Sequence, residues 1–396
     1  MKVYIICRQP FPYGMAATNR IKCYAKALLE QSIDCEVITY IRTEFVRNKR
    51  NIESCGIFEG IPFKYIGGSS YRNKNKLIRW INDVIDKIRL YIYLKKNLVK
   101  SDIVFCYSGL DIDFILKLQL LVHSKGAKFV SELCELPYES DFYSNKTKVG
   151  YDKTVHKLFP HNDGIVAISE TLVGVANKFK SSHTKVIKIP ILVDFEKYRM
   201  QDKSDLSEFP YIFHSGTLFE KKDGIVGMLE AFGRASLKVD PSVKFISTGR
   251  LDSSPHKKEI IEIIKKYKLN DRVIFVGYLS DADLKDYLSK ATIVIINKYK
   301  TKQNEYCFST KLGEYLAASK PLIITNVGEA MNWLTTDVNA WIVEPEDKEA
   351  LSGAIIYAFN HPNERKKIGI AGQLQCQRFF DYKAQSTILA NFFNSI

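Results

Sequence analysis

Long apolar runs are missing from this sequence of 396 residues, and no stretch approaches the roughly 18–20 uninterrupted apolar residues that a membrane-spanning helix needs. The N-terminal apolar run, Val3–Cys7, is too short for the core of a signal peptide. It predicts a buried first strand instead.

Patterns for disulfides and for metal ligands are also missing. The eight Cys are scattered without a Cys-x-x-Cys pair, and most lie in or beside apolar runs, which predicts buried free thiols in a reducing compartment. None of the seven His forms a pair with metal-ligand spacing. Asp111-Ile112-Asp113 has an Asp-x-Asp spacing, but it opens a predicted helix, where acidic groups complement the helix dipole. We therefore expect no metal site.

Positive charge is present in excess and is unevenly distributed. The formal net charge is +14, and residues 1–200 hold 32 Lys and Arg against 20 Asp and Glu, whereas residues 201–396 hold 26 against 24. The first half therefore attracts anions, which nucleic acid, an anionic membrane or a pyrophosphate-bearing acceptor could supply. No helix-turn-helix, zinc or single-strand-binding pattern accompanies the charge, so nucleic acid is not an expected partner.

Short apolar runs alternate with longer segments of helical period throughout the chain. This alternation predicts an α/β fold with parallel sheets covered by helices on both faces. Helices are predicted at 18–31, 111–125, 224–237 and 281–289. The predicted strands are 3–7, 35–40, 103–107, 128–131, 164–168, 185–189, 211–215, 243–248, 272–276, 292–296 and 321–325.

A polar stretch without a clear period, Asp194–Pro210, divides the pattern. We expect a Rossmann-like domain at 1–195, a second at 196–380, and a C-terminal helix at 381–396 that crosses back to the first domain. Two doubly wound domains would face each other across a cleft, and ligands of open α/β sheets bind at the carboxyl ends of the strands.

The segment Asn304–Glu329 carries the strongest local signal. Ser309 or Thr310 can cap a helix whose first backbone N–H groups would bind a diphosphate. Lys311 lies in the first turn, which is unfavourable for the helix dipole unless an anion binds nearby. Glu314, one turn further, is placed to accept hydrogen bonds from a ribose diol. An ordinary capped helix–strand unit is the alternative.

This segment resembles the donor-binding segment of glycosyltransferase family 4, whose members are retaining enzymes of the GT-B fold. Glu314 matches the second Glu of the family pattern, which the resemblance implies holds the donor ribose. The first Glu of that pattern falls at Tyr306, with Glu305 beside it. Either Glu305 replaces it, or backbone groups of 308–311 handle the sugar, which we favour. The resemblance implies donor contacts at Phe308, Ser309, Thr310, Lys311 and Leu312.

Other donor-side positions follow the same family order. Gly216 and Thr217 follow a predicted strand, and Lys222 precedes a glycine, as in the family's Lys-Gly turn. The resemblance implies that Lys222 and Lys311 neutralise the diphosphate leaving group. Gly249 resembles the glycine after the next strand. Gly277 and Tyr278 resemble a loop against the nucleotide base. His214 is open to two interpretations, a core histidine or a phosphate contact.

The first domain resembles the family more loosely. Gly14 matches an N-terminal glycine loop that lets the backbone approach donor or acceptor. Glu132 and Glu135 follow a predicted strand where related enzymes place groups that face the transferred sugar. They are either solvated loop carboxylates or groups that orient the acceptor hydroxyl and take its proton.

The segment 72–100 combines Lys and Arg with apolar residues at three-to-four spacing, which predicts an amphipathic helix. Its apolar face either packs into the first domain or contacts an anionic membrane surface.

Together with these patterns, the resemblance implies a metal-independent glycosyltransferase without a cofactor. It would move a hexosyl or N-acetylhexosaminyl group from a nucleoside diphosphate sugar, with UDP favoured, to a saccharide or lipid-pyrophosphate-linked acceptor. Surface polysaccharide or lipopolysaccharide biosynthesis is the expected pathway, and the cytoplasm or the inner face of the cytoplasmic membrane is the expected place. The alternatives are a nucleotide-sugar epimerase of the same fold and a non-catalytic sugar-nucleotide binder.

Overall fold

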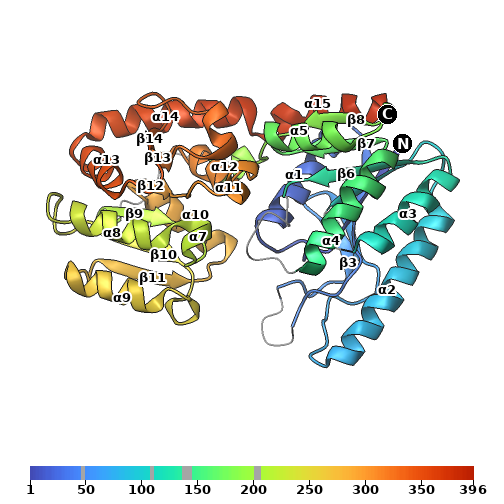
Figure 1. Cartoon of the computed structure of the whole chain (residues 1–396), viewed down its shortest axis with the longest axis horizontal. Coiled ribbons are helices and arrows are strands. Elements are labelled where there is room, and N and C mark those ends of the chain that lie inside the picture. The colour runs from blue at the N-terminus through green and yellow to red at the C-terminus, as the bar shows by residue number, and fades with distance from the viewer. Residues whose placement is uncertain (46–49, 108–110, 136–144, 200–206) are drawn as a thin grey trace. The chain divides into compact units, whose positions relative to one another are not determined.

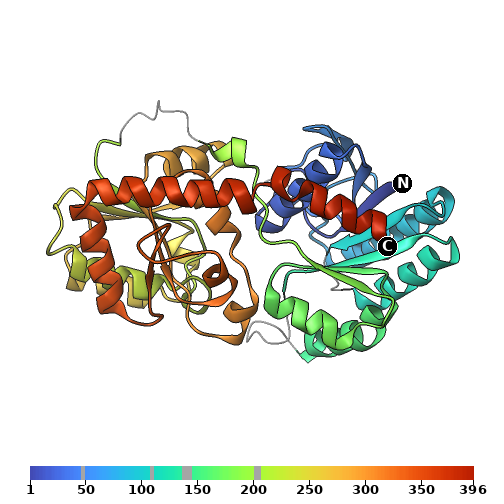
Figure 2. The same cartoon turned by 90° about the horizontal axis from the view of Figure 1, so that it is seen from above.

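The structure, a computed structural model, describes residues 1–45, 50–107, 111–135, 145–199 and 207–396, with the backbone alone at 145–148. The chain divides into two compact units (Figures 1 and 2). The first unit contains Met1–Val193 and Tyr382–Ile396, and the second contains Asp194–Asp381.

The first unit is an eight-stranded sheet with helices on both faces (Figure 1). Its elements are β1 (Lys2–Cys7), α1 (Ala16–Glu30), β2 (Asp34–Thr39), β3 (Cys55–Phe58), β4 (Ile61–Tyr65), α2 (Lys76–Asn97), β5 (Ile103–Tyr107), α3 (Ile112–Ser124), β6 (Lys128–Leu133), α4 (Asn145–Lys153), β7 (Gly164–Ala167), α5 (Glu170–Phe179), β8 (Lys185–Lys188) and α15 (Tyr382–Ser395).

The strand order of this sheet is β3-β4-β2-β1-β5-β6-β7-β8, and every pair is parallel except β3 with β4. The expectation of purely parallel sheets is therefore wrong at this edge. The β3–β4 hairpin was missed because its first strand, Cys-Gly-Ile-Phe, is mostly exposed and has no apolar period. A two-residue connection can join only antiparallel strands.

Alternate residues of β1 enter two different cores. Val3, Ile5 and Cys7 pack on the side of α1 and α15, whereas Tyr4 and Ile6 pack with residues of α2 and α3. This is the two-fold alternation of a strand buried on both faces. The last helix, α15, lies against α1, and its Phe393 ring contacts Phe105 with ring centroids 5.5 Å apart.

The second unit is a six-stranded parallel sheet of order β11-β10-β9-β12-β13-β14. Its elements are α6 (Phe195–Tyr198), β9 (Tyr211–His214), α7 (Glu220–Asp223), α8 (Ile225–Ala235), β10 (Lys244–Thr248), α9 (Lys257–Lys266), β11 (Val273–Gly277), α10 (Asp281–Lys290), β12 (Ile293–Ile296), α11 (Lys302–Tyr306), α12 (Thr310–Ala317), β13 (Leu322–Thr325), β14 (Trp341–Val343), α13 (Lys348–Asn360) and α14 (Pro362–Phe379).

The strand order of the second sheet reverses between β9 and β12, which are neighbours although about 80 residues separate them in sequence. Because helices leave these two strands toward opposite faces of the sheet, a crevice forms at their carboxyl ends, and open α/β sheets bind ligands there. The residues that follow β9 and β12 are therefore the first place to look for a site. Together, the two sheets confirm the predicted α/β fold with two Rossmann-like domains.

Candidate functional site

The loop after β9 is held rigidly at the carboxyl end of the second sheet. Ser215 N donates to Tyr315 Oη (2.7 Å), and Gly216 N donates to Thr248 Oγ1 (2.7 Å). Thr248 Oγ1 in turn donates to Gly216 O (2.9 Å). The neighbouring strand β10 and helix α12 thus fix the loop from both sides, so its backbone is preorganised for a ligand.

Gly216 has no room for a side chain. A β-carbon at this position would lie 2.5 Å from His214 Nε2, 2.6 Å from Lys311 Nζ and 3.1 Å from Asp223 Oδ2. The three side chains therefore converge on the α-carbon of Gly216. Of this group, the sequence predicted Gly216 and Lys311 as donor-site residues and left His214 open.

Asp223 is the anion at the centre of this group. It is buried, pairs with Lys311 Nζ, and accepts hydrogen bonds from Thr217 N (2.8 Å) and Thr217 Oγ1 (2.5 Å). Burial by itself would raise the pKa of Asp223, but Lys311 and neighbouring cations hold the pKa well below its usual range. Lys311 thus already forms an ion pair with an acidic residue of the protein itself. The sequence reasoning, which sought only an external anion for Lys311, missed Asp223.

Two further lysines flank the pair. Lys298 follows β12, and its Nζ donates to Lys222 O (3.0 Å) and Asn304 Oδ1 (3.4 Å). Burial lowers the pKa of Lys298, and the positive charges of Lys311 and Lys222 act in the same direction against the attraction of Asp223. The Lys222 side chain is exposed at the end of α7. We call Lys222, Lys298 and Lys311 the lysine cluster; its net charge with Asp223 favours an anionic ligand.

His214 is a neutral side chain within this positive surrounding. It is 1% exposed, its Nδ1 lies 3.3 Å from Ile295 O, and its Nε2 has no hydrogen-bond partner among the described residues. Burial lowers the pKa of His214 to about 3, with Lys311 acting in the same direction. The carbonyl of Ile295 requires the proton on Nδ1, so Nε2 is left as an acceptor that faces Gly216.

Helix α12 begins at the predicted place, with Ser309 as its N-cap residue, but the Ser309 side chain makes no capping hydrogen bond. The first-turn amides are thus not satisfied by the cap side chain, as an anion-binding helix start requires. Thr310 and Glu314 are half-buried on this helix. Phe308 packs against Phe380 and Leu312 is fully buried, so these two predicted contacts can offer only their backbone.

The position of the missing family Glu lies on the short helix α11. Glu305 is exposed there and Tyr306 is half-buried. Gly328, with φ +72°, packs so closely that a β-carbon would lie 2.4 Å from Asn304 O. The start of the 3-10 helix Gly328–Asn332 therefore covers α11 on one side.

Gly249 and Gly277 meet after β10 and β11. Gly249 N donates to Gly277 O (3.0 Å), and both residues have positive φ, +95° and +74°. Tyr278, which is 62% exposed, carries the Arg250 guanidinium over its ring at 5.7 Å. This pair forms an exposed, flat surface suited to a nucleotide base. Arg250 had not been identified from the sequence.

The two predicted carboxylates of the first domain, Glu132 and Glu135, differ in burial. Glu132 lies within β6 rather than in a solvated loop, it is buried, and its Oε1 pairs with Arg20 Nε at 2.7 Å. Arg20 also donates to Pro190 O and Ile189 O, so it ties β6 to the segment after β8. Glu135, in contrast, is exposed after β6. The solvated-loop alternative is therefore wrong for Glu132.

Gly14 precedes α1, and a β-carbon there would lie 2.0 Å from Thr18 Oγ1. The glycine is thus required by local packing, since Thr18 Oγ1 donates to Pro10 O (2.7 Å) and cannot move away without losing that bond. Among the described residues, no group of His, Cys, Asp and Glu could hold a metal ion. Asp111 pairs instead with Arg8 and Lys87, and Asp113 with Lys153.

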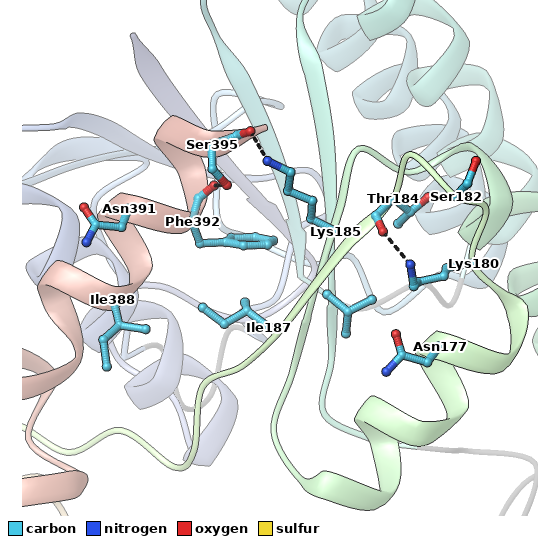
Figure 3. A pocket seen from close by; sticks show the side chains of 11 residues that line it. Asn177, Lys180, Ser182, Thr184, Lys185, Ile187, Ile388, Asn391, Phe392 and Ser395 are labelled. Carbon is cyan, nitrogen blue, oxygen red and sulfur yellow. Dashed lines mark hydrogen bonds between the residues drawn. The ribbon is translucent and has the colours of Figure 1, made fainter.

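A groove of about 690 Å³ lies elsewhere in the first unit, between α5, β8 and α15 (Figure 3). Its two lysines are occupied by main-chain carbonyls, because Lys185 Nζ donates to Ser395 O and Lys180 Nζ donates to Thr184 O. The groove therefore has two lysines held by main-chain carbonyls, whereas the lysine cluster brings three lysines together around a single Asp.

Comparison with known families supports the donor side of this arrangement. Residues 196–375 match the sequence model of the family described as "Glycosyl transferases group 1". No curated protein matches the chain by sequence. For the second unit, the resemblance stated from the sequence is therefore confirmed at the level of the group 1 glycosyl transferases.

Several solved structures share the fold over the whole chain. Sucrose-phosphate synthase from Thermosynechococcus elongatus has a TM-score of 0.76 at 15% identity, covering 100% of this chain and 98% of that one. HepE of Anabaena, solved with UDP-glucose, has a TM-score of 0.71 at 14% identity, covering 100% of both chains. A glycosyltransferase from Rickettsia africae has a TM-score of 0.69 at 17% identity, covering 100% and 98%. These similarities confirm the GT-B fold.

Proposed function

Starting from the match of residues 196–375 to the group 1 glycosyl transferases and from the GT-B fold of the chain, we propose that this protein is a metal-independent, retaining glycosyltransferase. It takes a hexosyl or N-acetylhexosaminyl group from a nucleoside diphosphate sugar and transfers it to a saccharide or lipid-linked saccharide. The observation that carries the proposal is the lysine cluster beside the start of α12, at the switch point of the second sheet.

The chemistry that this arrangement can support is stabilisation of a leaving group. Breaking the bond between sugar and diphosphate places negative charge on the diphosphate. Lys222, Lys298 and Lys311 together with the first-turn amides of α12 would hold this charge, which is the work that a metal ion performs in other sites. Because burial lowers the pKa of Lys298, a bound diphosphate would also restore a favourable surrounding for its charge.

One observation favours a UDP-sugar in particular, and a second favours a nucleotide of any base. HepE, which shares the fold, was solved with UDP and with UDP-glucose, and Arg250 over Tyr278 provides a surface for a planar base. Glu314, on α12, is the residue proposed to bind the ribose hydroxyls. The excess positive charge of residues 1–200 favours an acceptor that carries phosphate or pyrophosphate, as in surface polysaccharide or lipopolysaccharide biosynthesis at the inner face of the cytoplasmic membrane.

A thermal-shift panel of UDP, GDP, ADP and their glucose conjugates tests the donor. A ligand present at 100 times its Kd stabilises the folded state by about 2.7 kcal/mol, so the correct nucleotide separates from the others. We expect UDP to give the largest shift, and Lys222→Ala to reduce it. Equal shifts with all nucleotides, or none with any, would contradict the proposal.

An epimerase of the same fold is the second candidate, because Tyr306 stands where the family pattern has its first Glu and the handling of the sugar therefore differs. Incubation of a UDP-sugar without acceptor separates the two. An epimerase yields a new UDP-sugar, whereas a transferase yields at most slow hydrolysis to UDP and free sugar. Saturable UDP binding with neither product, against any pool of acceptors, would instead identify a non-catalytic binder.

A further inference from the structure

Helix α2 (Lys76–Asn97) presents an apolar face to solvent. Nine large apolar residues of this helix are between 37% and 65% exposed, whereas Leu90 and Leu94 are its only buried apolar residues. We call these nine residues the α2 face: Leu77, Ile78, Trp80, Ile81, Val84, Ile85, Ile88, Tyr91 and Ile92.

The α2 face is continuous on one side of the helix. At 100° per residue, its members fall within an arc of about 160°, and Leu90, Leu94 and the buried Asp86 fall outside that arc. The first ten residues of α2 include no buried residue. In Figure 1 these first turns extend past the sheet of the first unit. The alternative that this face packs into the first domain is therefore wrong for the described residues.

The charges around the α2 face are positive. Both acidic residues of the helix are engaged on its inner side, Asp83 with Arg72 (3.5 Å) and Asp86 with Arg42 (3.0 Å) and Arg89 (3.6 Å). The exposed lysines of the helix and its flanks lie at both ends of the face: Lys74, Lys76, Lys95, Lys96 and Lys100. An apolar surface with cations at both ends has the arrangement of a helix that lies in the interface of an anionic bilayer.

We propose that the α2 face binds the surface of an anionic phospholipid bilayer, with its apolar side chains among the acyl chains and its lysines at the headgroups. The bilayer would be the surface at which the proposed transferase meets a lipid-linked acceptor. Only this purpose of lipid binding rests on the proposed function. Binding to lipid itself stands on the α2 face alone.

A second copy of the chain fits the face less well. A two-fold contact through the α2 face would place the lysine-rich ends of two helices against each other, in either direction of pairing, because both ends are positive. Like charges at such a contact are unfavourable. Anionic headgroups, in contrast, complement every exposed charge of the helix.

Co-sedimentation with phosphatidylcholine vesicles, with and without phosphatidylglycerol, tests the proposal. We expect the full chain to bind the anionic vesicles, and we expect Ile81→Glu with Ile88→Glu to lower the partition coefficient at least about tenfold. Leu237→Glu, which places one such charge on an apolar residue of the second unit that is more exposed than Ile81 or Ile88, is the control and should bind as the wild type does. Thermal shift by UDP should be the same in all of these proteins, so a failure here is separable from a failure of the proposed donor.

Fluorescence gives a second readout, because Trp80 is 64% exposed on the α2 face, whereas Trp341 is buried and Trp333 packs against Phe379 and Phe380 in the second unit. Anionic vesicles should shift the emission of the wild type to shorter wavelength, and Trp80→Phe should abolish that shift. Failure of the wild type to bind anionic vesicles would overturn the proposal. Equal losses in the Ile81→Glu, Ile88→Glu protein and in Leu237→Glu would also overturn it, as would a solution dimer that these α2 substitutions convert to a monomer.

Discussion

At the scale of single residues, the donor site depends on lysines that are held in unequal surroundings. Lys311 is neutralised by Asp223, Lys222 is exposed, and Lys298 is half-buried with a lowered pKa. A bound diphosphate should therefore interact favourably with Lys298, because its negative charge would offset the burial that lowers the pKa of this lysine.

Replacing Lys298 by Met should weaken UDP binding at least about tenfold, because one charge-assisted hydrogen bond to phosphate contributes about 1.5–3 kcal/mol. Titration calorimetry with UDP measures the effect. Lys265→Met, on the exposed side of α9, removes the same charge away from the cluster and serves as the control. Unchanged affinity in Lys298→Met would remove this lysine from the site.

His214 predicts a dependence of stability on pH. Its pKa is about 3 in the folded protein against an ordinary value of 6.5, so between these values the unfolded chain binds more protons. The contribution of His214 to the free energy of unfolding is therefore complete above pH 6.5 and is lost as the pH falls toward 3.

Denaturation by urea at pH 6.5 and at pH 4.5 measures this loss. His214→Gln should reduce the difference between the two free energies of unfolding by about 2 kcal/mol, since a fully displaced proton contributes 1.36 kcal/mol per pH unit. Identical pH dependence in the variant and the wild type would mean that His214 titrates normally.

At the scale of single residues, only site residues that lie within motifs could be predicted from the sequence. Gly216, Lys222 and Lys311 were predicted because each falls at a motif position of the family that the sequence resembles, close to a strand or helix end. Asp223, Lys298 and Arg250 were missed, since their importance arises from contacts with residues far away in sequence, from 28 residues for Arg250 with Tyr278 to 88 residues for Asp223 with Lys311. Glu132 was misplaced because β6 continues to Leu133, two residues beyond the predicted strand end.

At the scale of elements, the loop after β9 is packed so closely that Gly216 has no room for a side chain. Gly216→Ala should cost about 1–3 kcal/mol of stability and weaken UDP binding at least about tenfold, because its methyl group meets the His214 ring, which is held by Ile295 O. Gly353→Ala is the control for the substitution itself. Nothing lies within 4 Å of a β-carbon there, inside α13, so it should stabilise the protein by up to about 1 kcal/mol.

Chemical denaturation and UDP titration of both glycine variants measure these effects. Gly216→Ala with wild-type affinity for UDP would show that the loop is not part of the donor site.

At the start of α12, the effect of a residue on helix capping and its effect on phosphate binding can be measured separately. Ser309→Ala should change the free energy of unfolding by less than about 0.5 kcal/mol, because the Ser309 hydroxyl makes no capping hydrogen bond. Asp347→Ala, at the N-cap of α13, should lower the free energy of unfolding by about 1 kcal/mol, because Asp347 Oδ1 accepts a hydrogen bond from Ala350 N at 2.8 Å. If the Ser309 hydroxyl binds phosphate, its loss should weaken UDP binding about fivefold. Urea denaturation and UDP titration of the two variants decide this, and equal stability losses would contradict the geometry of the cap.

The strands of both sheets could be predicted largely because they are buried on both faces and appear as continuous apolar runs. The eleven predicted strands all occur, with ends shifted by at most two residues. The strands that were missed have weak patterns: β3 is mostly exposed, β4 contains Pro62 and Lys64, and β14 has only three residues. The exposure of the α2 face could not be foreseen, since an apolar period looks the same whether the face meets a core or a membrane.

At the scale of the whole molecule, the fold is shared with proteins that are 11–17% identical in sequence. This is expected of parallel α/β sheets, which need buried strands and covering helices but few particular residues. Within this shared fold, the donor segment of this chain differs at Tyr306 from the family pattern that it resembles.

The central claim is that the lysine cluster and α12 bind the nucleotide of a sugar donor, and the affinity of UDP for Glu314→Ala and Lys222→Ala tests it most directly. Calorimetry should show a loss of about tenfold or more for each variant, with Glu305→Ala unchanged, since Glu314 is proposed to hold the ribose and Lys222 the diphosphate. Wild-type affinity in both Glu314→Ala and Lys222→Ala would contradict the account.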